Sequence, residues 1–370
     1  MDQLIQSIHQ TLSDYRADEN DQSVRITPAG IQEWILQFEE SDRLPILKEL
    51  DNIFKKRYYS KKQVEDLLTT VVEFLTKEYK FENERDFLNN AVFIRTQPKG
   101  KSQSIMLDML DKIVQVKYSI SLAECGSSSR QYSIYLDDIL CTGLKLITDT
   151  KTWADEKYSF DKTNKQAVEE NLTKLIFVYV FIHTKNYDLK KKELYYTSKG
   201  LADKHKMYRA VEIDNCIEAK SKIDLIMPVE ESDKLIIDYK NNTVLTVNEY
   251  NKRYDKTSPE EFYRPDTIPV TEGFFTSPEN RKIVERAFLR KGIEILNAAN
   301  VNNKNMRALG YSIPSRKNFG FGALCFTWRN VPNNAPLVFW YLGGGFIPLF
   351  KVRRGNQAFD LDSLLSQLNG

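Results

Sequence analysis

The chain has 370 residues, of which 41% are hydrophobic and 12% aromatic, and a formal net charge of +2. This length and composition allow a large buried core, and we expect one elaborated α/β domain with an added helical section. No run of about eighteen apolar residues could span a membrane, and the polar first residues do not form a secretory signal. We therefore predict a soluble, cytoplasmic protein with no membrane partner.

The N-terminal section, residues 1–84, is predicted to be helical. Thr27 followed by Pro28 is typical of a helix start, with a capping threonine and a proline at the first helical position. Ser60 and Gln63 have the spacing of a capping box, and apolar residues then recur at helical spacing. We expect these helices to pack as a cap on the domain that follows.

Residues 85–360 are predicted to form an α/β domain. A short apolar run begins at Ala91, and a polar loop and an amphipathic helix follow it. The run 174–184 is continuously apolar, which is typical of a central parallel strand. Further strands are predicted at residues 134–136, 209–217, 223–227 and 235–239. We expect a mostly parallel central sheet flanked by helices.

The C-terminal part, residues 281–356, is basic. Ser277 and Pro278 predict the start of a helix, and the glycine- and aromatic-rich stretch after it is predicted as strand, loop and strand. No acidic residue lies between Glu294 and Asp360, although eight lysine and arginine residues do. Such a block is typical of a protein with an anionic partner, but a solvated basic face is the simpler explanation of charge alone.

Four cysteines and three histidines are scattered along the chain without a CxxC pair. We therefore expect neither a zinc site nor a disulfide framework. No short spacing joins a cysteine to a histidine, so the sequence does not support Cys/His catalysis, and isolated buried cysteines are usually packing residues.

The stretch SIYLDDILCTGLKL places two aspartates, Asp137 and Asp138, at the predicted exit of a strand. In open parallel sheets, ligands bind beyond the carboxyl ends of the strands. A loop of small residues such as Cys141, Thr142 and Gly143 lets backbone N–H groups converge on a phosphate, and the next helix adds its positive end. Ionised carboxylates accept hydrogen bonds from neighbouring hydroxyls, as in a ribose. The motif predicts a ribose 5-phosphate site, and a capping pair at a helix start is the alternative.

This stretch resembles the phosphoribosyl-pyrophosphate loop of type I phosphoribosyltransferases over residues 133–145. The resemblance implies that fold, with Asp137 and Asp138 as the catalytic pair that holds the ribose. It also implies Mg²⁺ that bridges diphosphate and ribose, without an assured side-chain ligand. The implied phosphate-binding residues are Cys141, Thr142, Gly143, Leu144 and Lys145. Lys145 stands where the family usually has threonine or serine, and Cys141 where it often has a hydroxyl.

The polar loop 95–104 lies where type I enzymes keep their diphosphate-binding loop, directly after the first core strand. By this resemblance the candidate diphosphate or partner contacts are Arg95, Lys99, Lys101, Ser102 and Ser104. The loop is longer than is usual in that family. A solvated basic loop explains the same residues equally well.

A longer resemblance spans residues 32–351 and includes FGFGALCFTW and VPNNAPLVFW. It is similar to the phosphoribosyltransferase-like domain of bacterial conflict systems. This implies an effector or accessory of a retron-associated antiphage system, which binds phosphoribosyl pyrophosphate or a related nucleotide and transfers the phosphoribosyl group to an unknown acceptor. The alternatives are a sensor without turnover, or a module that binds a reverse transcriptase, its DNA or RNA product, or another defence subunit.

Overall fold

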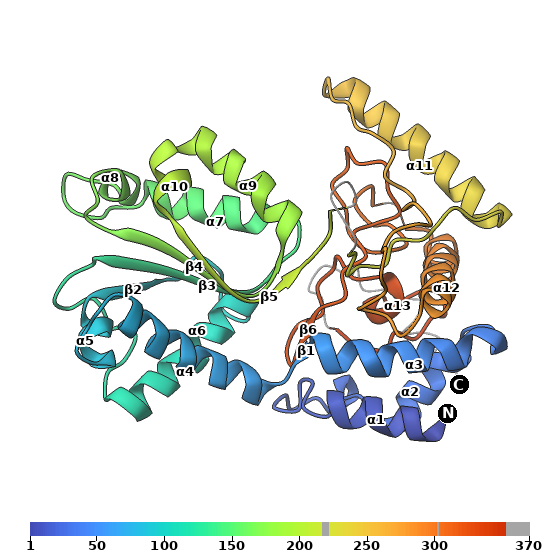
Figure 1. Ribbon diagram of the computed structural model, residues 1–370, viewed down its shortest axis with the longest axis horizontal. Helices are drawn as coiled ribbons and strands as arrows, with labels where there is room; N and C mark the ends of the chain where they lie inside the picture. The colour runs from blue at the N-terminus through green and yellow to red at the C-terminus, as the bar shows by residue number, and fades with distance from the viewer. Residues whose placement is uncertain (217–221, 302, 353–370) are drawn as a thin grey trace, which may run out of the picture.

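The computed structural model describes residues 1–216, 222–301 and 303–352. One half of the molecule is built on a four-stranded parallel sheet, and the other half joins the N-terminal helices to the C-terminal part (Figure 1). The strand order is β2-β3-β4-β5. The strands are β2 (Ala91–Ile94), β3 (Tyr132–Leu140), β4 (Lys174–His183) and β5 (Lys206–Ile213). No helix in these described ranges is both long and apolar enough to cross a membrane.

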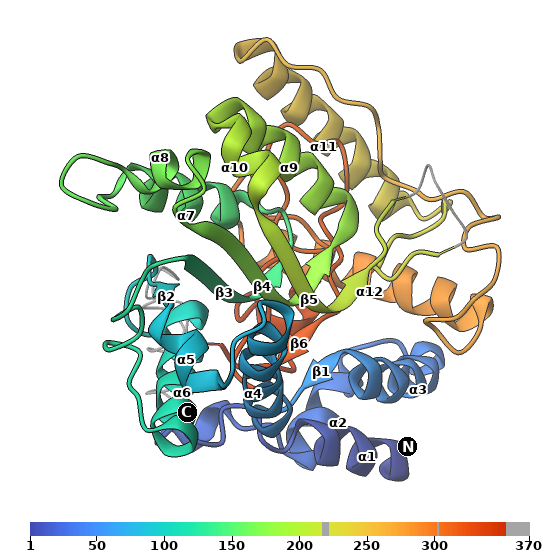
Figure 2. The same cartoon turned by 60° about the vertical axis from the view of Figure 1, so that its left-hand side comes forward.

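Helices cover both faces of this sheet because its strands are apolar on both sides. Ile134 and Leu136 of β3 pack in one core cluster, and Tyr135 between them packs in another. Figure 2 shows one face covered by α4 (Lys61–Glu78), α5 (Glu84–Asn89) and α6 (Ser102–Tyr118). The other face carries α7 (Leu144–Asp155), α8 (Asn164–Glu169), α9 (Thr184–Thr197) and α10 (Lys199–Lys204). The predicted α/β class with a parallel sheet flanked by helices is confirmed.

The second half of the molecule packs the two ends of the described chain together. Its helices are α1 (Asp2–Leu12), α2 (Pro28–Leu36), α3 (Glu40–Arg57), α11 (Lys234–Arg253), α12 (Pro278–Ala298) and α13 (Leu337–Trp340), with a short 3₁₀ turn at Gln22–Val24. A two-residue strand, β1 (Tyr58–Tyr59), pairs in parallel with β6 (Phe326–Thr327). Trp34 is fully buried, and its Nε1 donates a hydrogen bond to the Val338 carbonyl at 2.8 Å. The N-terminal helices therefore share a core with the C-terminal part.

Three helix starts lie where capping signals predict them. The Gly30 N–H donates to Thr27 Oγ1 at 3.1 Å, and the Asn280 N–H donates to Ser277 Oγ at 3.1 Å. Ser60 and Gln63 form the predicted capping box at the start of α4. The strand predicted to begin at Ala91 is confirmed as β2, and the strand predicted at 174–184 is confirmed as β4, which ends one residue earlier, at His183.

Several predicted strands are wrong. Residues 235–239 belong to α11, which Asp233 caps by accepting a hydrogen bond from the Leu235 N–H at 2.8 Å. Residues 223–227 form no strand, because the Ile223 and Leu225 carbonyls accept hydrogen bonds from the Arg281 side chain. The strand predicted at 209–217 is β5, which begins at Lys206 and ends at Ile213; residue 217 lies outside the described residues.

The predicted strand, loop and strand of the C-terminal stretch is also corrected. Its only regular elements in the described residues are the two-residue β6 and the four-residue α13. Two of the eight basic residues between Glu294 and Asp360 pair with acidic residues of other segments: Arg316 with Glu261, and Arg329 with Asp18 and Glu19. Arg353, Arg354 and the predicted boundary at 360 lie outside the described residues.

We expect Gly322→Ala to destabilise the protein by about 1–3 kcal/mol. Gly322 has φ +73°, and an added Cβ would lie 2.2 Å from the Ile226 carbonyl oxygen, so backbone would have to move. Urea unfolding measures the effect. Gly273→Ala is the control, because its Cβ would meet nothing within 4 Å; equal midpoints for the two variants would contradict the prediction.

Candidate functional site

The acid pair lies inside β3 rather than at its exit. The strand continues to Leu140, and Asp137 is in register with Tyr179 of β4. Only 5% of Asp137 and 4% of Asp138 is exposed. The expectation of an acid pair at the strand exit is corrected, because Ile139 and Leu140 extend the pairing with β4 beyond it.

Asp137 accepts hydrogen bonds at both carboxylate oxygens. Oδ1 accepts from Ser102 Oγ and from the Asp138 N–H, both at 2.9 Å. Oδ2 accepts from Gln97 Nε2 at 2.9 Å and from the Tyr135 hydroxyl at 3.2 Å. Ser102 at the start of α6 and Gln97 of the loop after β2 are therefore tied to Asp137.

Asp138 is tied to the C-terminal part. Its Oδ2 accepts a hydrogen bond from Asn330 Nδ2 at 2.8 Å, and its Oδ1 accepts from the Ile139 N–H at 2.8 Å. Asn330 lies 192 positions away in the chain, and sequence reasoning missed it, since no local signal marks such a partner. The acid pair thus joins the sheet to the other half of the molecule.

A third carboxylate, Asp149 of α7, completes this group and was also missed. Its Oδ2 accepts a hydrogen bond from the Tyr135 hydroxyl at 2.7 Å, and its Oδ1 lies 2.7 Å from Lys145 Nζ. The four-residue spacing of Lys145 and Asp149 on a helix was the signal available in the sequence. Lys145, predicted as a phosphate contact, uses its ammonium group here for Asp149.

Burial dominates the electrostatics of the pair. It raises the pKa of Asp137 to about 8, with a further rise from the charge of Asp138, and the hydrogen bonds from the Asp138 N–H and Ser102 oppose this. Burial also raises the pKa of Asp138, against the hydrogen bond from Asn330. Two carboxyl groups so close titrate as a unit.

We predict that the protein loses stability as the pH rises toward 8. Between the ordinary pKa of 3.8 and about 8, folded Asp137 keeps a proton that the unfolded chain releases. The unfolded state then binds fewer protons, so the free energy of unfolding falls by up to about 1.4 kcal/mol per pH unit from this group. Urea unfolding between pH 5 and 8 should show a flatter profile for Asp137→Asn, and an unchanged one for the exposed Asp155→Asn. A slope that survives Asp137→Asn would contradict this assignment.

The loop after β3 leads directly into α7. Gly143 has φ +71°, and no side chain among the described residues caps the helix that follows it. The first-turn N–H groups of α7, from Leu144 and Lys145 onward, therefore form an uncapped positive helix end, which is suited to an anion. Lys190 of α9 packs on the loop, with its Cγ 2.5 Å from where a Gly143 Cβ would stand.

A cavity of about 290 Å³ opens beside this loop. Its lining includes Thr142, Lys185 and Lys190 of α9, Asn215 after β5, and Arg316 of the C-terminal part. Lys190 pairs with Glu193, and Lys185 and Arg316 both pair with Glu261. The cavity therefore lies between the two halves of the molecule, with Thr142 at its border.

The five candidate residues of the diphosphate loop differ in whether they already contact other protein groups. Arg95 donates to Ser104 Oγ and to Asp108, both at 2.9 Å, so Arg95 and Ser104 already contact protein groups. Lys99 and Lys101 are exposed. Ser102 is the first residue of α6 and bonds to Asp137.

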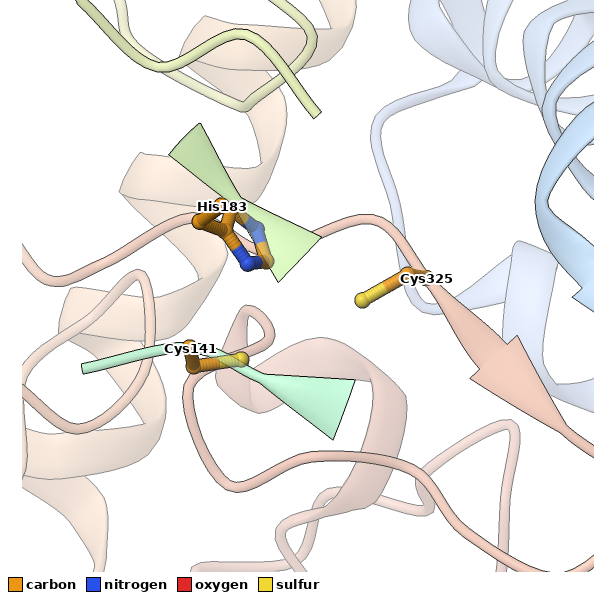
Figure 3. A group of neighbouring side chains, drawn as sticks. All are labelled: Cys141, His183 and Cys325. Atoms are coloured by element: carbon orange, nitrogen blue, oxygen red, sulfur yellow. The ribbon is translucent and has the colours of Figure 1, made fainter. Parts of the chain in front are cut away.

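The surroundings of Cys141 do not favour a phosphate-binding role for its thiol. Its thiol lies with His183 and Cys325, and the three potential ligand atoms are all within 4.8 Å of one another (Figure 3). Burial raises the pKa of Cys141 and lowers that of His183 to about 4. No short spacing in the sequence joins these three residues, because the fold brings together segments that lie far apart along the chain.

The carboxylate oxygens of the acid pair, which could bind Mg²⁺ directly, already take part in hydrogen bonds. All four carboxylate oxygens of Asp137 and Asp138 accept hydrogen bonds from protein groups. A metal held by a ligand's phosphate oxygens and by water would leave these hydrogen bonds in place.

Comparison with known proteins identifies the family. The family model described as PRTase-CE matches residues 31–352, which include the whole sheet, the loop 141–145 and Asn330. The chain belongs to the PRTase-CE family. No curated protein and no solved structure matches it. Membership of the PRTase-CE family supports a phosphoribosyltransferase-like domain, with the acid pair and the loop on the central strand β3.

Proposed function

We propose that the loop 141–145 binds the 5-phosphate of phosphoribosyl pyrophosphate or a related nucleotide. The observation that carries the proposal is the left-handed Gly143, which joins the strand of the acid pair to the uncapped start of α7. Backbone N–H groups and the helix dipole there favour a phosphate. Membership of the PRTase-CE family supports the same ligand class.

To bind ribose, the acid pair must exchange one hydrogen-bond donor of the protein for a ribose hydroxyl. Asn330 donates to Asp138 Oδ2, and a ribose hydroxyl can replace that donor without leaving the carboxylate unpaired. A Mg²⁺ ion bound together with the ligand would be held by phosphate oxygens and water, and would neutralise charge on the diphosphate. In a transfer reaction the bond between ribose and diphosphate would break, diphosphate would leave, and a nucleophilic atom of the acceptor would form the new bond to the sugar. A carboxyl group of the acid pair in its ionised form would stabilise the positive charge that develops on the ring.

A sensor without turnover is the second candidate, and the Asp138–Asn330 hydrogen bond favours it. A ligand that donates to Asp138 in place of Asn330 breaks this hydrogen bond, which joins the sheet to the C-terminal part. Loss of that hydrogen bond would signal to another subunit that the ligand is bound. An effector or sensor role beside a reverse transcriptase in a bacterial antiphage system, with its DNA or RNA product as partner, remains part of this proposal.

Calorimetric titration with phosphoribosyl pyrophosphate and Mg²⁺ tests the proposal. We expect binding by the unaltered chain and at least tenfold weaker binding by Asp138→Asn, because an amide cannot accept at both positions. Asp155→Asn, at an exposed position of the same α7, is the matched control.

Diphosphate release measured in the same samples separates the two candidates. Release together with binding supports the transferase, and binding without release supports the sensor. If the unaltered chain does not bind the ligand, the proposed site is wrong.

A further inference from the structure

Three buried side chains from distant segments converge at the junction of the two halves of the molecule. Cys141 follows the end of β3, His183 ends β4, and Cys325 directly precedes β6. His183 and Cys325 are fully buried, and Cys141 is 7% exposed. Their ligand atoms all lie within 4.8 Å of one another, and Figure 3 shows both sulfur atoms and the imidazole facing a common space.

The hydrogen bonding of His183 leaves one ring nitrogen available. Nδ1 lies 2.8 Å from the Leu140 carbonyl oxygen, which only accepts, so Nδ1 carries the proton. Nε2 is buried and has no hydrogen-bond partner in the described part of the chain. In a neutral imidazole Nε2 then carries a lone pair, and a backbone carbonyl behind the other nitrogen is the usual support of a metal-binding histidine.

We propose that Cys141, His183 and Cys325 bind a Zn²⁺ ion as a Cys₂His site. Two sulfur ligands and one imidazole nitrogen suit zinc, and three protein ligands leave a fourth position for water or a small ligand. Two thiolates neutralise the charge of the ion, so the buried site has no net charge, and binding releases the two thiol protons. Tetrahedral zinc needs ligand atoms roughly 3.3–3.8 Å apart, so the separation of at most 4.8 Å closes by side-chain rotation.

The metal would join the sheet to the C-terminal part. His183 and Cys141 end neighbouring strands, because Leu140 of β3 is in register with Ile182 of β4, and Cys325 comes from the opposite half. The site stands beside the loop 141–145, yet it uses none of the groups proposed to bind phosphate except the residue that begins the loop. Metal binding can be measured without the proposed ligand, so this site is testable on its own.

Metal content and cobalt substitution of the full chain test the site. We expect about one zinc per chain after growth with zinc and removal of loose metal. Co²⁺ added to metal-free protein should produce the thiolate-to-cobalt charge-transfer absorption and the intense visible bands of a tetrahedral site. Both readouts use the unaltered protein, so they do not depend on how variants fold.

Cysteine substitutions test which side chains bind the metal. Cys141→Ser and Cys325→Ser should each reduce bound zinc at least tenfold and remove the cobalt–thiolate absorption. The matched controls Cys125→Ser and Cys216→Ser, at partly exposed cysteines outside the cluster, should keep both. Zinc-free protein without the cobalt bands, equal loss in the control variants, or a Cys141–Cys325 disulfide in protein purified under reducing conditions would overturn the proposal.

Discussion

Arg281→Met is expected to lower the free energy of unfolding by about 3–5 kcal/mol. Arg281 is 1% exposed, and its guanidinium contacts Glu272 at 2.5 Å and Glu285 at 3.2 Å. It also donates to the Ile223 and Leu225 carbonyls at 2.6 and 3.2 Å. Methionine fills much of the volume but donates nothing, so two buried carbonyls and two carboxylates each lose one donor.

Urea unfolding of Arg281→Met checks this value. Lys282→Met, one position further along the same helix, is the control, because Lys282 is half exposed and its one ion pair within the described residues is with the exposed Asp266. Such a surface pair contributes little, so its variant should stay within about 1 kcal/mol of the unaltered chain. Similar losses for both variants would mean that the buried network does not stabilise the fold.

Gly143→Asp is expected to weaken binding of phosphoribosyl pyrophosphate at least about 100-fold, or about 2.7 kcal/mol. The change places a carboxylate at the uncapped start of α7, where it competes with a phosphate for the same N–H groups. It also puts a Cβ at φ +71° and 2.5 Å from Lys190 Cγ.

Gly345→Asp is the matched control for that experiment. Gly345 has φ +76°, and an added Cβ there would meet nothing within 4 Å. The substitution therefore causes similar backbone strain to Gly143→Asp, but outside the loop 141–145. Calorimetric titration of both variants, with circular dichroism to establish that they fold, separates strain from loss of the phosphate site. Unchanged binding by Gly143→Asp would remove this loop from the proposed site.

Local signals in the sequence predicted much of the fold. The caps at Thr27, Ser60 and Ser277 and the apolar runs of β2 and β4 depend on neighbouring residues, so a single sequence contains them. The short run 235–239 was misread, because five mostly apolar residues fit a strand as well as one face of a helix. The longer spacing of buried Ile236, Thr243 and Val247 distinguishes α11 as a helix.

The sequence by itself determined the α/β class, the run from β3 through the acid pair and the loop to α7, and the family resemblance, because these features are contiguous along the chain. Only the tertiary structure decided what surrounds them. Asn330 reaches Asp138 across 192 positions, and Cys325 joins Cys141 and His183. Such partners are set by how the two halves of the molecule pack, and packing between distant segments leaves no spacing that one sequence can show.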